Sequence, residues 1–156
     1  MVDIAEVQAF FFRAMREGYA GSGQKTEVAD MPGYKEIRFS EGDFLLVDRY
    51  CVAPNLVKSA GTTTIWFDGV PVWVMNYGGY YEEEAISILK RALSTAYQRE
   101  EFFGGRGQFV FTNGGLLYTN HPRLNDFARF EGREEVFGTT GRTSLGFHDY
   151  WGMSLL

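Results

Sequence analysis

The sequence predicts an α+β domain: one antiparallel sheet of about eight strands, built from hairpins, with two main helices on one face. Alternating runs separated by short turns predict the hairpins, and the clearest turn is Asp68-Gly69. Apolar residues at helical spacing predict one helix over about residues 3–17 and a second that begins at residues 82–84. Nineteen glycines against four prolines fit the tight turns of a hairpin-rich fold.

The chain has the length of a single domain, residues 1–156, with one core. It is 45% hydrophobic and contains 14 Phe, 9 Tyr and 3 Trp. A core of this size holds without a metal ion or a disulfide. Cys51 is the single cysteine, which excludes an intramolecular disulfide and fits a reducing compartment. We expect its thiol to be a buried apolar group.

The charge of the chain argues against several classes of partner. The formal net charge is −5, and no run of Lys or Arg is present. We therefore expect no direct nucleic-acid binding and no membrane-surface binding. Charged residues near the N-terminus argue against a signal peptide, and no apolar run approaches the ~20 residues that cross a bilayer. These observations predict a cytoplasmic protein.

The first elements follow from local signals. Asp3 and Glu6 form a capping-box pattern at the start of the first helix, and Gly18 ends it. Residues 21–33 are expected to form a polar loop. The alternation over residues 35–39 and 44–52, with a turn between them, predicts a hairpin, and residues 54–60 are expected to form a connecting loop.

The Asp68-Gly69 turn sets the pairing of the next hairpin. A two-residue Asp-Gly loop pairs Phe67 with Val70 and, continued regularly, Ile65 with Val72. This register places Trp66, Trp73, Met75 and Tyr77 on one face. Both faces are then apolar, which predicts that both are covered. Pro71 further implies that no third strand pairs at its position.

The second half repeats the order of helix and hairpins. Glu82–Glu84 places carboxylates at the start of the second helix, and Gly104-Gly105 is expected to end it. Strands over residues 108–111 and 116–119 flank a turn at Asn113–Gly115. A loop is expected around His121-Pro122. Residues 127–137 and 145–155 predict a fourth hairpin.

Similar motifs suggest that the chain is a duplicated α-β4 unit with halves of about residues 1–80 and 81–156. Gly61 and Ile65 precede Asn76–Gly79, as Gly132 and Val136 precede Asp149–Gly152. The two units would be related by a pseudo-twofold axis. Because two helices cover only one face of such a sheet, the other face is the natural place for a ligand or partner.

The motifs together resemble a known family. They are Gly61–Trp66, Val72–Gly79, Phe130–Glu134 and His148–Gly152. This set is similar to that of an uncharacterised bacterial and archaeal domain of unknown function, over nearly the whole chain. Similar domains sometimes follow a helix-turn-helix module in predicted regulators, which implies a sensing or interaction role. One N-terminal helix cannot form such a module here, and the family implies no catalytic residues.

Several side chains are candidates for a site. His148 can contact a ligand or transfer a proton, or be a hydrogen-bonded structural residue. Arg49 can clamp a carboxylate or phosphate, or pair with Glu134 or another acid. Glu134 can bind a cation beside aromatic rings, or be a solvated strand residue. Neighbours on a strand point to opposite faces, so His148 and Asp149 cannot act together within one strand. The aromatic candidates are Trp66, Trp73, Tyr77 and Tyr150.

Other motifs carry no chemistry. Gly104–Gly107 follows a helix and precedes a strand, the reverse of nucleotide-binding loops, and is expected to be a helix stop with a bend. Glu82–Glu84 caps a helix. No His, Cys and Asp grouping has zinc spacing, so we expect neither metal nor cofactor.

Three functions are compatible with these features. The first is a non-enzymatic, sensor-like module that binds a small molecule or peptide on an aromatic sheet face. The second is a homodimeric interaction domain that buries this face against a copy of itself or another protein. The third is an enzyme that uses His148 and Glu134, or Asp48, which would have to converge in one pocket.

Overall fold

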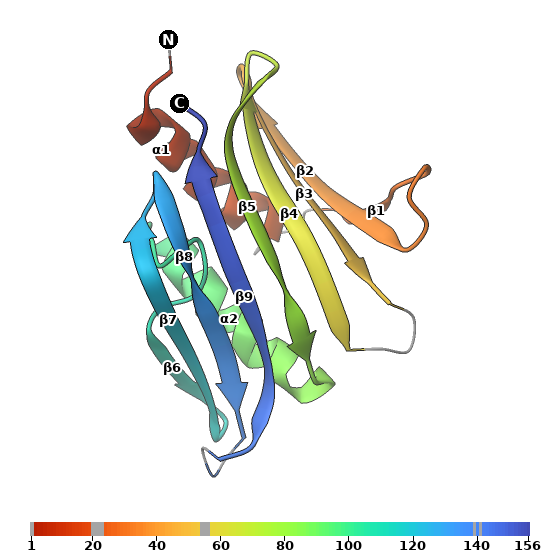
Figure 1. The fold of residues 1–156 in the computed structure, drawn as a ribbon, viewed down its shortest axis with the longest axis vertical. Coiled ribbons are helices and arrows are strands. Elements are labelled where there is room, and N and C mark those ends of the chain that lie inside the picture. The colour runs from red at the N-terminus through yellow and green to blue at the C-terminus, as the bar shows by residue number, and fades with distance from the viewer. Residues whose placement is uncertain (1, 20–23, 54–56, 139, 141) are drawn as a thin grey trace.

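A computed structural model describes residues 2–19, 24–53, 57–138, 140 and 142–156. It contains one antiparallel sheet of nine strands in the order β1-β2-β3-β4-β5-β9-β8-β7-β6, and both helices lie on one side of it (Figure 1). The prediction of about eight strands is therefore wrong. We call the sheet face toward the helices the inner face and the opposite one the outer face. No helix in the described part of the chain is long and apolar enough to cross a membrane.

The helices and strands have these bounds: α1 Ile4–Ala14, extended by a π-helical turn Met15–Tyr19, β1 Thr26–Glu27, β2 Tyr34–Glu41, β3 Phe44–Val52, β4 Lys58–Phe67, β5 Val70–Tyr81, a 3₁₀ turn Glu83–Ala85, α2 Ile86–Gln98, β6 Val110–Asn113, β7 Leu116–Asp126, β8 Arg129–Phe137 and β9 Ser144–Ser154.

The unpredicted strand is β1, which lies within the segment expected to be a polar loop. It is two residues long and forms the edge of the sheet beside β2, where Thr26 lies opposite Glu36. Both of its residues are exposed, so it carries no apolar alternation that would mark it in the sequence. The rest of the expected loop includes residues 20–23, which lie outside the described residues, as do residues 54–56 of the expected connecting loop.

The helix starts are as predicted, but the second helix ends earlier. Reciprocal hydrogen bonds of 2.9 Å between Asp3 and Glu6 form the capping box of α1. Helix α2 ends at Gln98, well before Gly104. Glu100 takes a positive φ of 55°, and a backbone in that region cannot continue a right-handed helix. The helix stop is thus a non-glycine residue that the sequence did not mark.

The Asp68-Gly69 turn is confirmed, with φ values of 48° and 75° and Phe67 opposite Val70. The predicted register fails one step further on. A β-bulge shifts the pairing so that Ile65 faces Trp73 instead of Val72. One extra residue in a strand reverses the faces of all that follow it. Trp66 and Trp73 therefore lie on opposite faces, not on one. Pro71 pairs with Trp66 in β4. On its other side β9 begins to pair with β5 only at Trp73, as predicted from the missing N–H of Pro71.

The loop expected around His121-Pro122 is instead part of β7. His121 lies opposite Arg133 and Pro122 opposite Gly132 in β8, with a bulge after Pro122. The unpaired residue of the bulge is Arg123. Strand β6 pairs with β7 only as far as Thr119, so no strand on that side requires an N–H from Pro122. The hairpin turn after β7 falls at Phe127 and Ala128.

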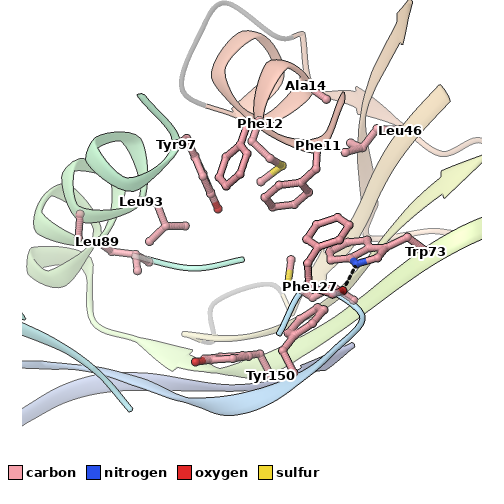
Figure 2. Packing of buried hydrophobic residues seen from close by; sticks show 14 of the residues in the cluster. Phe11, Phe12, Ala14, Leu46, Trp73, Leu89, Leu93, Tyr97, Phe127 and Tyr150 are labelled. Atoms are coloured by element: carbon pink, nitrogen blue, oxygen red, sulfur yellow. Dashed lines mark hydrogen bonds between the residues drawn. The ribbon is translucent and has the colours of Figure 1, made fainter. Parts of the chain in front are cut away.

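The core lies between the inner face and the two helices (Figure 2). Trp73 is fully buried at its centre and stacks on Phe127, with ring centroids 5.1 Å apart. Its indole Nε1 donates a 3.0 Å hydrogen bond to the Phe127 carbonyl, which satisfies its buried donor. Phe11 of α1 and Tyr97 of α2 pack on the cluster from the helix side. Trp73 is therefore a core residue.

Strands β5 and β9 pair at the middle of the sheet and bring the two similar motifs together. Asn76 lies opposite Trp151 and Gly78 opposite Asp149. This pairing joins two antiparallel meanders, β1 to β5 and β6 to β9. The first meander has five strands and the second four, so the predicted division into two α-β4 units is wrong.

Candidate functional site

The predicted site residues divide between the two faces of the sheet. Cross-strand pairing sets this division: Tyr77 lies opposite Tyr150, and Glu134 opposite His148. These four side chains and Trp73 are on the inner face, whereas Trp66 and Arg49 are on the outer face. The single aromatic face that the sequence predicted is thus two separate surfaces.

Glu134 is neither solvated nor alone. It is fully buried in β8 and forms an ion pair with Arg106, whose side chain is 3% exposed. Arg106 Nε donates to Glu134 Oε1 at 2.9 Å, and the Tyr118 hydroxyl donates to Oε2 at 2.7 Å. Two charges so deep in a protein are stable only when paired and hydrogen-bonded, as here.

Arg106 enters the core from the glycine-rich segment after α2. Gly104 and Gly105 have φ values of 65° and 71°, in the region that favours glycine. Gly107 then donates its N–H to the Tyr118 hydroxyl at 2.9 Å. The segment is a bend, as expected, and the bend delivers a buried cation. In the sequence, the one signal for this buried cation was an arginine in a segment otherwise made of glycines, Gly104–Gly107.

His148 lies between Glu134 and a serine. Its Nε2 is 3.0 Å from the Ser59 hydroxyl oxygen, and its Nδ1 is 3.6 Å from Glu134 Oε1. Burial lowers the pKa of His148 to about 4, with a further contribution from Arg106, so the imidazole is neutral at pH 7. Nδ1 is buried and has no hydrogen bond to a described residue. No pattern in the sequence pointed to Ser59.

Asp48 is the second buried acid of the inner face. Its Oδ1 accepts hydrogen bonds from Thr63 at 2.9 Å and from the Tyr77 hydroxyl at 2.8 Å. Burial raises the pKa of Asp48, and these two donors act against that rise. The guanidinium of Arg106 lies 5.2 Å from the Tyr77 ring centroid, a cation–π distance. Tyr77 thus connects the Asp48 carboxyl to the Arg106–Glu134 pair.

Tyr150 has a structural role at the inner face. Its hydroxyl donates to Asn120 Oδ1 at 2.7 Å, and the Asn120 amide donates to the carbonyls of Phe103 and Gly107. These bonds tie the Arg106 segment to the sheet. Burial raises the pKa of Tyr150 well above its usual value, so its hydroxyl stays protonated.

The outer face is hollowed where β5, β9 and β8 run side by side. The depression has a volume of about 370 Å³. Gly78 presents no side chain there, and Trp151 beside it is 52% exposed. An exposed ion pair of 3.2 Å, Arg123 with Glu131, forms one wall. The lining residues are Asn76, Tyr77, Gly78, Arg123, Glu131, Gly132, Asp149, Tyr150 and Trp151.

The other outer-face candidates are engaged in ion pairs. Arg49 was expected either to clamp an anionic ligand or to pair with Glu134 or another acid, and in the structure it pairs with Glu36 at 2.8 Å. Asp149 receives two hydrogen bonds of 2.7 Å from Arg133, and this contact lowers the pKa of its carboxyl. His148 and Asp149 point to opposite faces, as predicted.

Two further expectations concern metal and thiol chemistry. Within the described ranges, no group of three His, Cys, Asp or Glu side chains is arranged to hold a metal ion. Cys51 is partly exposed, not buried as predicted, with its Sγ 3.6 Å from the Ala60 carbonyl. It lies near the end of β3, where the sheet gives it little cover.

The fold and these contacts define a single-sheet α+β domain with a buried charged network under one face and a depression on the other. Residues 56–152, from the start of β4 almost to the end of β9, match the model of a protein family described as Domain of unknown function (DUF5680), and the chain belongs to this family. The predicted resemblance to a family of unknown function is confirmed to that extent. Searches of curated proteins and of solved structures found no significant match.

Proposed function

We propose that the protein is a cytoplasmic binding module that takes a small zwitterionic molecule or the end of a peptide in the outer-face depression, by binding alone and without chemistry at that face. The observation that carries the proposal is the depression itself, of about 370 Å³ beside the half-exposed Trp151. Small-molecule sites have volumes from about 300 Å³ upward and combine an apolar wall with a few placed polar groups.

Trp151 supplies the apolar wall. The apolar surface of an exposed indole is removed from water only when another group covers it, and that removal is favourable. Its ring offers a flat surface on which an aromatic or aliphatic group can pack, while its N–H can still find an acceptor. The side chains of Tyr77 and Tyr150, two of the predicted ligand residues, point to the inner face, so these residues line the depression only with their backbone.

Arg123 and Glu131 supply the polar groups. Their side chains are 74% and 40% exposed, and such a surface ion pair contributes at most about 1 kcal/mol. Opening it costs little, and the two charges then match the carboxylate and the ammonium of a zwitterion. Asp149 is held by Arg133 and stays ionised, which favours the ammonium on that side.

Calorimetry with three probes tests this proposal. L-Tryptophan carries both charges, tryptamine only the ammonium and indole-3-acetate only the carboxylate. We expect L-tryptophan to bind most tightly and Trp151→Ala to weaken it about tenfold or more, as for a central aromatic contact. Met153→Ala is the matched control, because Met153 is exposed on the same strand but does not line the depression. Equal weakening by both variants, or no heat from any probe, would contradict the proposal.

A second candidate function is a homodimer that buries the outer face. Trp151 and Met153, both on the central strand β9, are 52% and 42% exposed, which favours this alternative. Light scattering at micromolar concentration separates the two. A monomer at all concentrations eliminates the homodimer, and a dimer that Trp151→Ala dissociates eliminates the open binding site.

A further inference from the structure

A row of paired residues crosses the inner face from β4 to β8. Ser59 lies opposite Gly79, Gly79 opposite His148, and His148 opposite Glu134. Gly79 has no side chain, and a Cβ there would lie 2.0 Å from the Phe147 carbonyl oxygen and 3.1 Å from the His148 ring. The Ser59 hydroxyl can therefore reach His148 across an intervening strand.

The row has the order hydroxyl, imidazole, carboxylate. Ser59 Oγ is 3.0 Å from Nε2 of His148, and the other ring nitrogen faces Glu134 Oε1 at 3.6 Å. Exposure falls along the row, from the partly exposed Ser59 through His148 at 5% to Glu134 at 0%. A histidine within hydrogen-bond reach of a serine hydroxyl can act as its base. Glu134 faces Nδ1 from beyond hydrogen-bond distance, so it acts on the ring through its charge.

We propose that Ser59 is a nucleophile that accepts an acyl group from a carboxylic ester, with His148 as its general base and Glu134 as the positioning residue. The proposal goes beyond the binding function, since it concerns the opposite face of the sheet. Ser59 Oγ forms a bond to the ester carbonyl carbon while its proton passes to His148 Nε2. The tetrahedral adduct then collapses, the bond to the leaving oxygen breaks, and that oxygen takes the proton from Nε2. Water then attacks the acyl carbon while its proton passes to His148 Nε2. The bond from that carbon to Ser59 Oγ breaks, Oγ takes the proton back from Nε2, and the carboxylic acid leaves.

The surroundings of His148 determine the rates of acylation and deacylation. Tyr77 and Tyr81 of β5 pack against its ring, with centroids 5.5 and 4.7 Å away, and Glu134 faces it from β8. Burial and Arg106 keep the pKa of His148 low, while Glu134 and Asp149 act in the opposite direction. The neutral imidazole is ready to accept a proton at pH 7. The imidazolium is poorly stabilised, because Glu134 is already paired with Arg106. We therefore expect acylation only by esters with good leaving groups, and slow deacylation.

Covalent labelling tests the proposal. The full chain is incubated with a fluorophosphonate probe and with p-nitrophenyl acetate, and adducts are located by mass spectrometry. We expect one adduct, on Ser59, that Ser59→Ala abolishes and His148→Asn slows about 100-fold, the usual contribution of a general base. Ser144→Ala is the matched control, because Ser144 Oγ donates to Glu135 at 2.6 Å without a histidine. Circular dichroism establishes that each variant is folded.

The pH profile of labelling by the unaltered chain decides the question even if His148→Asn does not fold. A base with a pKa near 4 predicts a rate that levels off above about pH 5. A rate that rises tenfold per pH unit from 6 to 9 indicates hydroxide-driven labelling and overturns the proposal. No adduct on Ser59, or one that His148→Asn leaves unchanged, overturns it as well. Calorimetry with L-tryptophan reports on the outer-face site independently, so a failure of labelling and a failure of that binding are distinguishable.

Discussion

The Tyr77 hydroxyl donates a 2.8 Å hydrogen bond to Oδ1 of Asp48, and it leans over Gly61 to do so. A Cβ at Gly61 would come within 2.4 Å of that hydroxyl oxygen. The bond therefore depends on a glycine in β4 between the two strands that carry its partners. It links Asp48 on β3 to the charged network around Arg106 on the far side of the Tyr77 ring.

Removal of that hydroxyl should destabilise the fold. Tyr77→Phe leaves Thr63 as the remaining hydrogen-bond donor to Asp48 among the described side chains and raises the pKa of Asp48 further. We expect a loss of about 1–3 kcal/mol in the free energy of unfolding, the cost of an unsatisfied buried acceptor. Urea denaturation measures it. Tyr80→Phe, whose ring packs on Phe147 at the outer face, should change stability by less than about 0.5 kcal/mol, and an equal loss there would refute this explanation.

The Arg106–Glu134 pair should contribute far more to the stability of the fold than a surface ion pair of the same chemistry. Arg106→Met leaves Glu134 as an unpaired buried charge, and we expect a loss of about 3–5 kcal/mol. Arg133→Met removes the bidentate partner of Asp149, whose side chain is 57% exposed, and should cost less than about 1 kcal/mol. Chemical denaturation of both variants at one pH compares the two. A small effect of Arg106→Met would mean that Glu134 is neutral in the folded state.

Stability should fall in mild acid because of His148. Its pKa is about 4 in the folded protein and 6.5 in the unfolded chain, so between these values the unfolded chain binds more protons. The stabilisation is complete above pH 6.5 and is lost as the pH falls towards 4. The loss amounts to about 3 kcal/mol, since each tenfold change in proton affinity corresponds to about 1.4 kcal/mol. The raised pKa of Asp48 opposes this trend at the acid end.

Thermal melts from pH 7 to pH 4 measure this dependence. His148→Asn should flatten the curve between pH 6.5 and 5. A variant that keeps the full slope would assign the titration to another group.

Gly104 should tolerate no side chain. Its φ is 65°, and a Cβ would lie 2.3 Å from the Tyr150 ring. Gly114 has a similar φ of 58° in the open turn between β6 and β7, with no atom within 4 Å. Both alanine variants incur the backbone cost of about 1 kcal/mol, and Gly104→Ala should add about 1–3 kcal/mol for the clash. Equal melting temperatures for the two would show that Tyr150 moves aside freely.

The sequence predicted what depends on neighbours along the chain. Asp68-Gly69 specifies its own turn geometry, and Asp3 with Glu6 specifies a helix start, because both act through backbone groups within three residues. The pairing of Trp73 was mispredicted because a bulge depends on tertiary packing: the extra residue, Val72, lets the indole enter the core against Phe127.

The charged network could not be predicted in the same way. Glu134 lies in a strand and Arg106 in a bend, and the hydrophobic pattern that predicts each element says nothing about their contact. Their partnership depends on the bend at Gly104 and on the order of β7, β8 and β9 in the sheet. The sequence identified Tyr77, Glu134 and His148 as polar or aromatic residues of note. It could not show that Ser59 lies in their row, since the register between β5 and β9 is set by residues far apart in the chain.

That same register has a kinetic consequence. Every other neighbouring pair in the sheet joins consecutive strands, whereas β5 and β9 are separated by α2 and three strands. Closing so long a loop is entropically slow, so the two meanders should form first and dock afterwards. Refolding rates of variants at Asn76 and Asp68 can test this order. If the β5–β9 contact is absent from the transition state, a substitution at Asn76 will speed unfolding and leave the folding rate unchanged.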